Sequence, residues 1–209
     1  MVSLEVWMAF LAEAAVLNLL PGTATMLVVA HALARTGRSA LGAIAGVLVA
    51  DAALIVLSRG DLGMFLGASG EVSFVLKWLG AVYLAYLGVR QWRAGARALT
   101  AAEGPSQGGA ALTGATQGAL VTLLNPRAID VHIGLFPLFL DPGAPSPLQM
   151  VALAATFLLL AAAALGLYAA VAAIARWLLR GRFGPDLLDR LSGGVLIGAG
   201  LFLVTLERA

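Results

Sequence analysis

Polar and ionisable residues stand inside an otherwise apolar stretch, residues 122–140 (TLLNPRAIDVHIGLFPLFL). A proline removes a backbone donor and clashes with the preceding turn, so a continuous helix is expected to break at position 126. If the stretch crosses a membrane, each central charge costs about 2.5–3.5 kcal/mol on insertion scales. Broken backbone at that depth is tolerated only inside protein or beside a wet cavity. We therefore predict a binding site here, with the candidate residues Asn125, Pro126, Arg127, Asp130 and His132.

A similar break stands about 105 residues earlier, in NLLPGT at 18–23. A helix that begins after such a break presents unpaired N–H groups and a positive dipole end, which favour a carboxylate. Gly22 would let a ligand approach the backbone closely, and Thr23 offers a hydroxyl. For Asn18 and Asn125 two roles are open, satisfying the carbonyls that the prolines free or contacting substrate. The predicted substrate-binding residues of this break are Asn18, Pro21, Gly22 and Thr23.

Asp51 is the one charged residue in a further apolar segment, 39–58. An intramembrane carboxylate is a functional candidate by default, as a partner for a cation or as a proton carrier. The structural alternative is a fixed salt bridge, for example to Arg127. Arg127 and Asp130 are three residues apart, so they share a helix face and could pair. A histidine side chain ordinarily titrates near neutral pH, so His132 could relay protons or only bond to a neighbouring helix. Substrate binding is predicted for Asp51, and proton coupling for Asp51, Asp130 and His132.

The composition of the chain is that of a membrane protein. Its 209 residues are 61% hydrophobic and 11% charged, whereas a soluble domain carries about 25% charge. The first apolar run has neither a basic leading segment nor a small-residue cleavage site, so we expect it to be retained as a span. The absence of cysteine excludes disulfides and thiolate metal sites. No cofactor is indicated.

Six apolar segments are long enough to cross roughly 30 Å of hydrocarbon. They are residues 4–34, broken at Pro21; 39–58; 72–89; 110–140, broken at Pro126; 148–177; and 187–206. Three spans in each half is an odd number, so two related halves would have opposite orientations in the membrane. We predict an all-α membrane protein with six transmembrane helices arranged as two inverted three-helix repeats, residues 1–92 and 110–209. A cytoplasmic linker, residues 93–109, would join them.

The basic residues indicate how the chain is oriented. Nine basic residues follow the first, third and fifth spans, and three lie on the opposite side of the membrane. The positive-inside rule places the nine in the cytoplasm. Both termini are then outside. The nine are Arg35, Arg38, Arg90, Arg93, Arg97, Arg176, Arg180, Arg182 and Arg190.

Glycines spaced four residues apart predict close contacts between helices, within one chain or in a homodimer. Two such pairs are present, Gly42 with Gly46 and Gly194 with Gly198. The other predicted partners are a small-molecule substrate, protons and the lipid bilayer. Nothing in the sequence indicates nucleic acid.

Four stretches, in this order, resemble the LysE/RhtB family of bacterial amino-acid exporters. They are LLPGTATMLVVAHALARTGRSALGAIAGVLVAD (19–51), KWLGAVYLAYLGVRQWR (77–93), LLNPRAIDVHIGLFPLFLDPGA (123–144) and LDRLSGGVLIGAGLFL (188–203). The resemblance covers nearly the whole chain and implies a six-span inner-membrane exporter that uses the proton gradient. It implies that the site falls on Pro21-Gly22, Asp51 and Asn125-Pro126-Arg127. The chain departs from the family at Thr23, usually proline, and at Asp130 and His132, usually large apolar or aromatic residues.

These features predict a secondary active exporter of amino acids, or similar small amphoteric metabolites, across the bacterial inner membrane by proton antiport. The alternative is an exporter of divalent metal such as cadmium or nickel, which would want clustered histidines and acids with ligand spacing. The chain has two histidines. A membrane enzyme would need a nucleophile with a base, or a metal triad, and the sequence shows neither. A channel would need rings of repeated polar residues.

Overall fold

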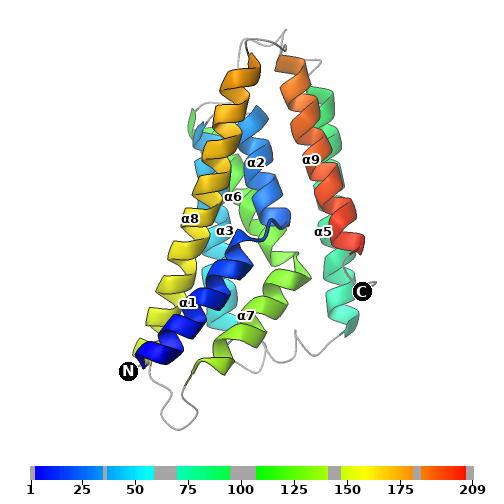
Figure 1. The fold of residues 1–209 in the computed structure, drawn as a ribbon. Helices are drawn as coiled ribbons and strands as arrows, with labels where there is room; N and C mark the ends of the chain where they lie inside the picture. The colour runs from blue at the N-terminus through cyan, green and yellow to red at the C-terminus, as the bar shows by residue number, and fades with distance from the viewer. Residues whose placement is uncertain are drawn as a thin grey trace.

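The described part of the chain is helical, without a strand among the described residues (Figure 1). The computed structural model describes residues 3–34, 37–58, 70–94, 107–140, 147–180 and 185–205. The predicted all-helical class is thereby confirmed. The helices are α1 (Leu4–Leu19), α2 (Thr23–Ala34), α3 (Gly37–Leu57), α5 (Gly70–Ala94), α6 (Gln107–Leu123), α7 (Pro126–Leu138), α8 (Pro147–Arg180) and α9 (Pro185–Thr205).

Two of these helices, α3 and α8, are each long and apolar enough to cross a membrane. The pairs α1–α2 and α6–α7 meet the same criterion together, and they are bent at their breaks by 52° and 67°. The described residues therefore contain two candidate spans, or four when each bent pair counts as one. The helix α5 has 25 residues, and the apolar part of α9, Arg190–Thr205, is shorter than a full span.

Both breaks occur at the prolines expected from the sequence. The residue before a proline is driven to extended backbone, and Leu20 accordingly has φ −71° and ψ 120°, ending α1. Asn125 has φ −96° and ψ 107° for the same reason. Pro126 is the first residue of α7, a position where the missing N–H costs nothing. Figure 1 shows both breaks near the middle of the bundle.

The helices α3 and α6 pack with their backbones in contact. A Cβ added at Gly46 would collide with the carbonyl oxygen of Ala115, and one at Gly118 with that of Ala43. Gly42 and Gly114 are equally confined. The close contact predicted at positions 42 and 46 is therefore confirmed, and it lies within the monomer. These glycines are not available for the homodimer that the sequence also allowed.

The contact between α9 and α5 uses different glycines from those predicted. A Cβ at Gly193 would lie 2.8 Å from the carbonyl oxygen of Gly88, and one at Gly200 would lie 3.0 Å from that of Ala81. At Gly198 an added Cβ would meet nothing within 4 Å. Positions 193 and 200 are seven residues apart, which is close to two helical turns and keeps both on one face. The predicted close contact at Gly198 is therefore not made within the chain, and a contact in a homodimer stays a prediction.

Aromatic side chains pack between α1, α7 and α8 beside the breaks. The ring of Phe10 meets that of Phe136 edge to face, with centroids 5.5 Å apart. Phe157 of α8 tilts against Phe136 with centroids 5.8 Å apart. Val28, Val47 and other apolar side chains form a second cluster between α2, α3 and α8. The region of the breaks thus has packed apolar side chains on two sides.

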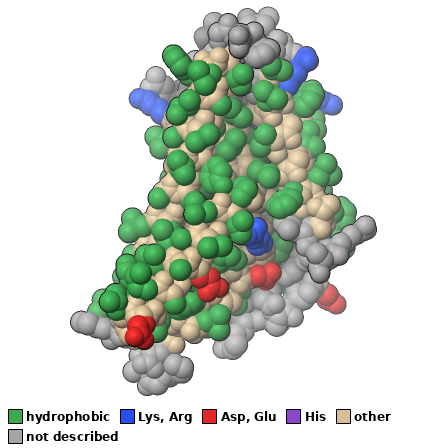
Figure 2. Space-filling view, in the orientation of Figure 1, with side chains coloured by type: hydrophobic (Ala, Val, Ile, Leu, Met, Phe, Trp, Pro, Cys, Tyr) green, Lys and Arg blue, Asp and Glu red, His purple; other side chains and the backbone are tan. Residues whose placement is uncertain are grey.

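Charged side chains separate along the bundle. Lys and Arg gather at the end where α8 finishes and α9 begins, apart from one basic side chain near mid-height, while Asp and Glu lie toward the other end (Figure 2). Apolar side chains cover the surface between. The predicted cytoplasmic arginines 35, 97 and 182, and residues 95–106 of the predicted linker, lie outside the described residues.

Candidate functional site

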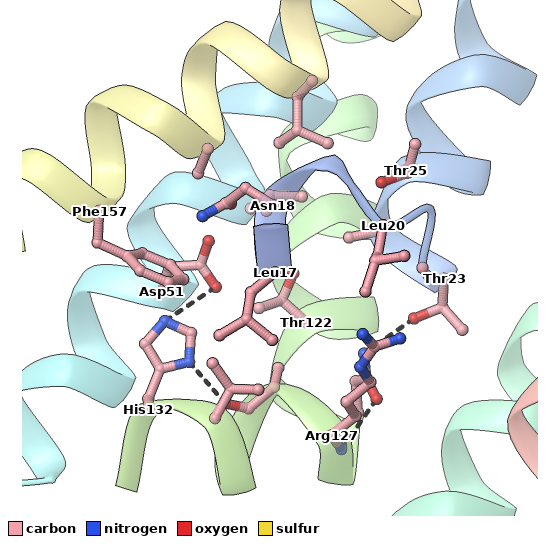
Figure 3. Close-up of a pocket in the computed structure, with 18 residues that line it drawn as sticks. Leu17, Asn18, Leu20, Thr23, Thr25, Asp51, Thr122, Arg127, His132 and Phe157 are labelled. Carbon is pink, nitrogen blue, oxygen red and sulfur yellow. Dashed lines mark hydrogen bonds and ion pairs between the residues drawn. The ribbon is translucent and has the colours of Figure 1, made fainter. Parts of the chain in front are cut away.

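A cavity of about 110 Å³ lies where the two broken helices meet. Residues from α1, α2, α3, α6, α7 and α8 line it, together with the two breaks (Figure 3). The predicted site residues Pro21, Pro126 and Asp130 are not among those that line it. The predicted residues that do line it are Asn18, Gly22, Thr23, Asp51, Asn125, Arg127 and His132.

Asn125 holds the two breaks together. Its side-chain oxygen accepts a hydrogen bond from the Arg127 N–H at 3.1 Å and so caps α7. Its amide nitrogen donates to the Thr23 hydroxyl, the first residue of α2, at 3.1 Å. The backbone carbonyl of Asn125 accepts from the N–H groups of Ala128 and Ile129. The first turn of α7 is therefore already satisfied, and it offers a ligand few donors.

The first turn of α2 is different. Its helical bonding begins with the Met26 N–H donating to the Gly22 carbonyl, so the preceding N–H groups lack the usual partner four residues back. Thr23, Ala24 and Thr25 all line the cavity. A Cβ at Gly22 would meet nothing within 4 Å, which leaves room for a ligand against the backbone. The positive end of one half-helix, rather than of both as predicted, thus faces the cavity uncapped.

Asn18 does not satisfy the carbonyl that Pro21 frees. Its amide donates at 2.8 Å to the carbonyl of Ala14, four residues earlier in α1. A different carbonyl, that of Leu19 at the end of α1, accepts from the Tyr168 hydroxyl of α8 at 2.7 Å. The side chain of Asn18 is half-buried and lines the cavity.

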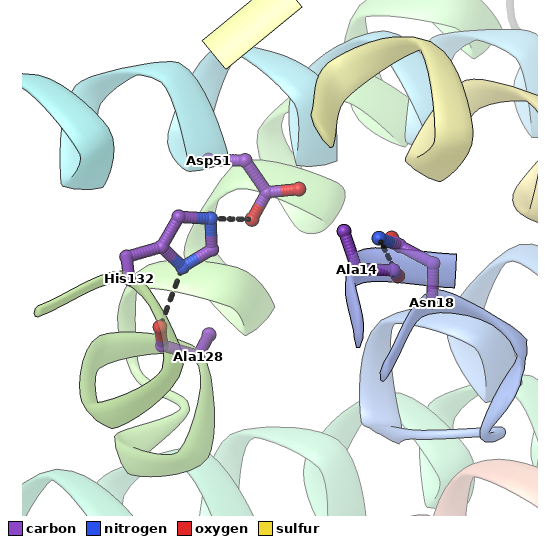
Figure 4. A network of polar contacts seen from close by, with 5 residues as sticks. All are labelled: Ala14, Asn18, Asp51, Ala128 and His132. Atoms are coloured by element: carbon purple, nitrogen blue, oxygen red, sulfur yellow. Dashed lines mark hydrogen bonds and ion pairs between the residues drawn. The ribbon is translucent and has the colours of Figure 1, made fainter. Parts of the chain in front are cut away.

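Asp51 and His132 meet at one side of the cavity (Figure 4). The His132 Nε2 lies 3.6 Å from the Asp51 Oδ1, and both residues are buried. The ring Nδ1 of His132 bonds to the Ala128 carbonyl at 2.6 Å. The structural alternative for Asp51 was a salt bridge to Arg127, and the observed partner is His132 instead. Because positions 51 and 132 are distant in sequence, nothing local could have paired them.

Arg127 and the start of α2 form the other side of the cavity. Figure 3 shows Arg127 beside Thr23 and Leu20, across the cavity from Asp51 and His132. Its side chain is half-buried. The cavity is therefore bipolar, with a carboxylate on one side and a guanidinium and a helix N-terminus on the other.

Asp130 is exposed and does not face the cavity. Successive residues of a helix are rotated by about 100°, so Asp130 and His132 lie on nearly opposite faces of α7. Ala128, Val131 and His132 take the inward face. The expectation that Asp130 neutralises Arg127 inside the cavity is not met by this arrangement.

Sequence reasoning missed most of the apolar residues that line the cavity, among them Phe157, and also the polar residues Thr25 and Thr122. Thr25 follows Thr23 by two residues in the first turn after a break, which is a usable signal. Phe157 stands in an apolar segment with no charged residue nearby in the sequence. Its role follows only from packing against His132, with ring centroids 4.8 Å apart.

A second buried polar cluster lies away from the cavity. His31, 5% exposed, bonds through Nδ1 to the Ser39 hydroxyl at 2.7 Å and through Nε2 to the Gln117 side-chain oxygen at 2.8 Å. These residues join α2, α3 and α6. Within the described part of the chain, no group of three or more His, Cys, Asp or Glu residues is placed to hold a metal ion.

The comparisons with known proteins cover most of the chain. The family model described as LysE type translocator matches residues 15–207. An uncharacterized membrane protein of Vibrio cholerae is 33% identical over 204 residues, 97% of this chain and 98% of the relative. The homoserine/homoserine lactone efflux protein of Salmonella typhimurium is 31% identical over 208 residues, 98% of each chain. The leucine efflux protein of Klebsiella pneumoniae is 29% identical over 143 residues, 68% of this chain and 66% of the relative. No solved structure matches.

Proposed function

The chain belongs to the LysE type translocator family, and on this premise we propose that it exports amino acids or similar small amphoteric metabolites across the bacterial inner membrane by proton antiport. The observation that carries the proposal is the bipolar cavity at the two breaks. An amino acid has an ammonium and a carboxylate held a short distance apart, and the two sides of the cavity complement them. The names of the Salmonella and Klebsiella relatives, for efflux of homoserine or its lactone and of leucine, support this class of substrate.

In this proposal the substrate carboxylate lies against the first turn of α2, where unpaired N–H groups and the helix dipole favour an anion. The Thr23 hydroxyl and the Arg127 guanidinium add donors on that side. The substrate ammonium lies against Asp51, with Asn18 beside it. Pro21, Gly22, Asn125 and Pro126 act by shaping the breaks. Asp130, which the sequence also assigned to the site, would act only from outside the cavity.

We further propose that α5 and α9 also cross the membrane, so that the chain has six spans in two inverted repeats. In this arrangement α1, α2, α3 and α5 of the first half correspond in order to α6, α7, α8 and α9 of the second. Three helix contacts then have a counterpart that is also present. The contact of α3 with α6 corresponds to that of α8 with α1, α2 with α8 corresponds to α7 with α3, and α2 with α9 corresponds to α7 with α5. Paired, proline-interrupted helices in corresponding positions are typical of transporter binding sites.

The orientation of the chain can be tested because it contains no cysteine. With both termini outside, Ser106→Cys lies in the cytoplasm, and Ser146→Cys lies outside. An impermeant thiol reagent should label the second variant in intact cells and the first only after the cells are opened. The basic residues that follow the odd-numbered spans motivate this assignment. The reverse labelling pattern would overturn the orientation.

Export itself can be measured in cells that express the protein. Cells preloaded with labelled homoserine or leucine should lose label faster than cells with an empty vector, and they should tolerate toxic analogues of the exported amino acid. The same cells should gain no resistance to cadmium or nickel. Metal resistance without any amino-acid efflux would replace the proposal with the divalent-metal alternative.

A further inference from the structure

We propose that Asp51 and His132 hold one exchangeable proton between them, and that the substrate ammonium displaces this proton by binding Asp51. The inference rests on the proposed export function and names the coupling site within it. The sequence grouped Asp130 with these two residues. The structure separates it from them, because Asp130 lies on the exposed face of α7.

The tautomer of His132 follows from its partner. A backbone carbonyl can only accept a hydrogen bond, so the Nδ1 that lies 2.6 Å from the Ala128 carbonyl must carry a proton. In the neutral ring Nε2 is then an acceptor. Among the described residues Nε2 has no hydrogen-bond partner, and the Asp51 Oδ1 lies 3.6 Å away. Two acceptors would face each other unless a proton lies on one of them.

The surroundings favour one proton on this pair. His132 is 2% exposed and Asp51 6%, and a buried charge without a partner is costly. Arg127 is the other ionisable residue among those that line the cavity, and α1, α2, α6 and α8 contribute none. With one added proton the Asp51–His132 pair is neutral overall, whether the proton is on nitrogen or on oxygen.

The rings around His132 keep Nε2 directed at Asp51. Phe136 stacks nearly parallel to the imidazole, with centroids 6.1 Å apart and planes at 8°. Phe157 meets it edge to face at 4.8 Å. With Nδ1 bound to the carbonyl one turn back, the ring has little freedom to rotate. A proton that leaves Nε2 therefore has either Asp51 or the cavity as its destination.

The exchange balances in atoms and charge. In the cytoplasm-facing carrier, a zwitterionic substrate places its ammonium against the Asp51 carboxylate, and the shared proton is released to water. The pair then carries one negative charge, which the ammonium compensates locally. After the substrate leaves on the outside, a proton binds the pair again. Each turnover moves one zwitterion out and one proton in, so one positive charge enters the cell.

The proton site can be tested without transport. The chain has two histidines, so ¹⁵N-histidine labelling gives two imidazole signals, and His132→Phe identifies the signal of His132. At pH 6 the wild-type protein should show a protonated Nδ1 and an Nε2 that shares a proton. Asp51→Ala should leave Nε2 bare. Two wild-type spectra would overturn the shared proton: one with an unprotonated Nε2, and one with a protonated Nε2 and an unprotonated Nδ1. Both can be recognised even if the Asp51→Ala variant does not fold.

The competition can be tested by binding of labelled homoserine and leucine to purified protein between pH 6 and 8. Where the pair is protonated, affinity should fall about tenfold for each unit by which the pH decreases, because one proton competes with each substrate. His132→Phe should move this dependence to lower pH, because the competing proton then binds Asp51 alone, and Glu13→Gln, which removes an exposed carboxyl on α1, should leave it unchanged. A pH-independent affinity in the wild-type protein would contradict the exchange. If the spectra show the shared proton but no amino acid is exported, the proposed function fails and the proton site stands.

Discussion

Asp51→Asn is expected to abolish export while the protein remains folded and inserted. Asparagine keeps the shape of the side chain but cannot balance an ammonium or take up a proton at physiological pH. Removing one partner of a buried charge pair costs about 3–5 kcal/mol, and about 1.4 kcal/mol corresponds to a tenfold change. The rate of labelled amino-acid efflux should therefore fall by roughly two to four orders of magnitude.

The matched control is Glu13→Gln, which removes a carboxyl that is exposed on α1 and does not line the cavity. This variant should export at the parent rate. Expression and a single symmetric peak in size-exclusion chromatography would show that both variants fold. If folded Asp51→Asn protein exports like the parent, Asp51 has a structural role only, and the ammonium site lies elsewhere.

Gly46→Ala is expected to destabilise the bundle strongly. Alanine is the better helix former by about 1 kcal/mol, so any loss of stability must come from the contact with α6. At this position the added methyl would collide with the backbone of Ala115, and backbone cannot rotate away as a side chain can. Overpacking of this kind costs about 1–3 kcal/mol and occasionally more.

Gly166→Ala is the control for this change, because an added Cβ in α8 meets nothing within 4 Å. The two variants have the same change in helix propensity and differ only in the space available. Thermal unfolding followed by size-exclusion chromatography should give a lower midpoint for Gly46→Ala and an unchanged or higher one for Gly166→Ala. Equal midpoints would show that α3 and α6 do not lie in backbone contact.

The features that the sequence predicted correctly have local causes. The prolines at 21 and 126 each lack a backbone N–H and clash with the preceding turn, and the helices end beside them. The isolated Asp51 must avoid lipid, and in the fold it lines the cavity. The glycines at 42 and 46 share a helix face without side chains, and the backbone of a neighbouring helix packs against that face.

The features that it missed depend on how the helices rotate and pair. His132 and Asp130 are two residues apart, and the sequence alone did not tell which of them faces inward. The rotation of α7 against α3 decides it, because only His132 reaches Asp51. His31 stands near the end of the first apolar segment, and only packing with Ser39 and Gln117, which are distant in sequence or on another helix, shows that it is buried. On α9, likewise, the approach of α5 selects Gly193 and Gly200.

The most direct test of proton-coupled export is transport by the purified protein in liposomes. With a lumen at pH 6 and an exterior at pH 7.5, vesicles should accumulate labelled homoserine or leucine above its external concentration, because protons leave as the amino acid enters. A protonophore should abolish the accumulation, and Asp51→Asn vesicles should show none. Accumulation that persists without a pH gradient or membrane potential, or uptake of cadmium or nickel in place of every amino acid tried, would contradict the account.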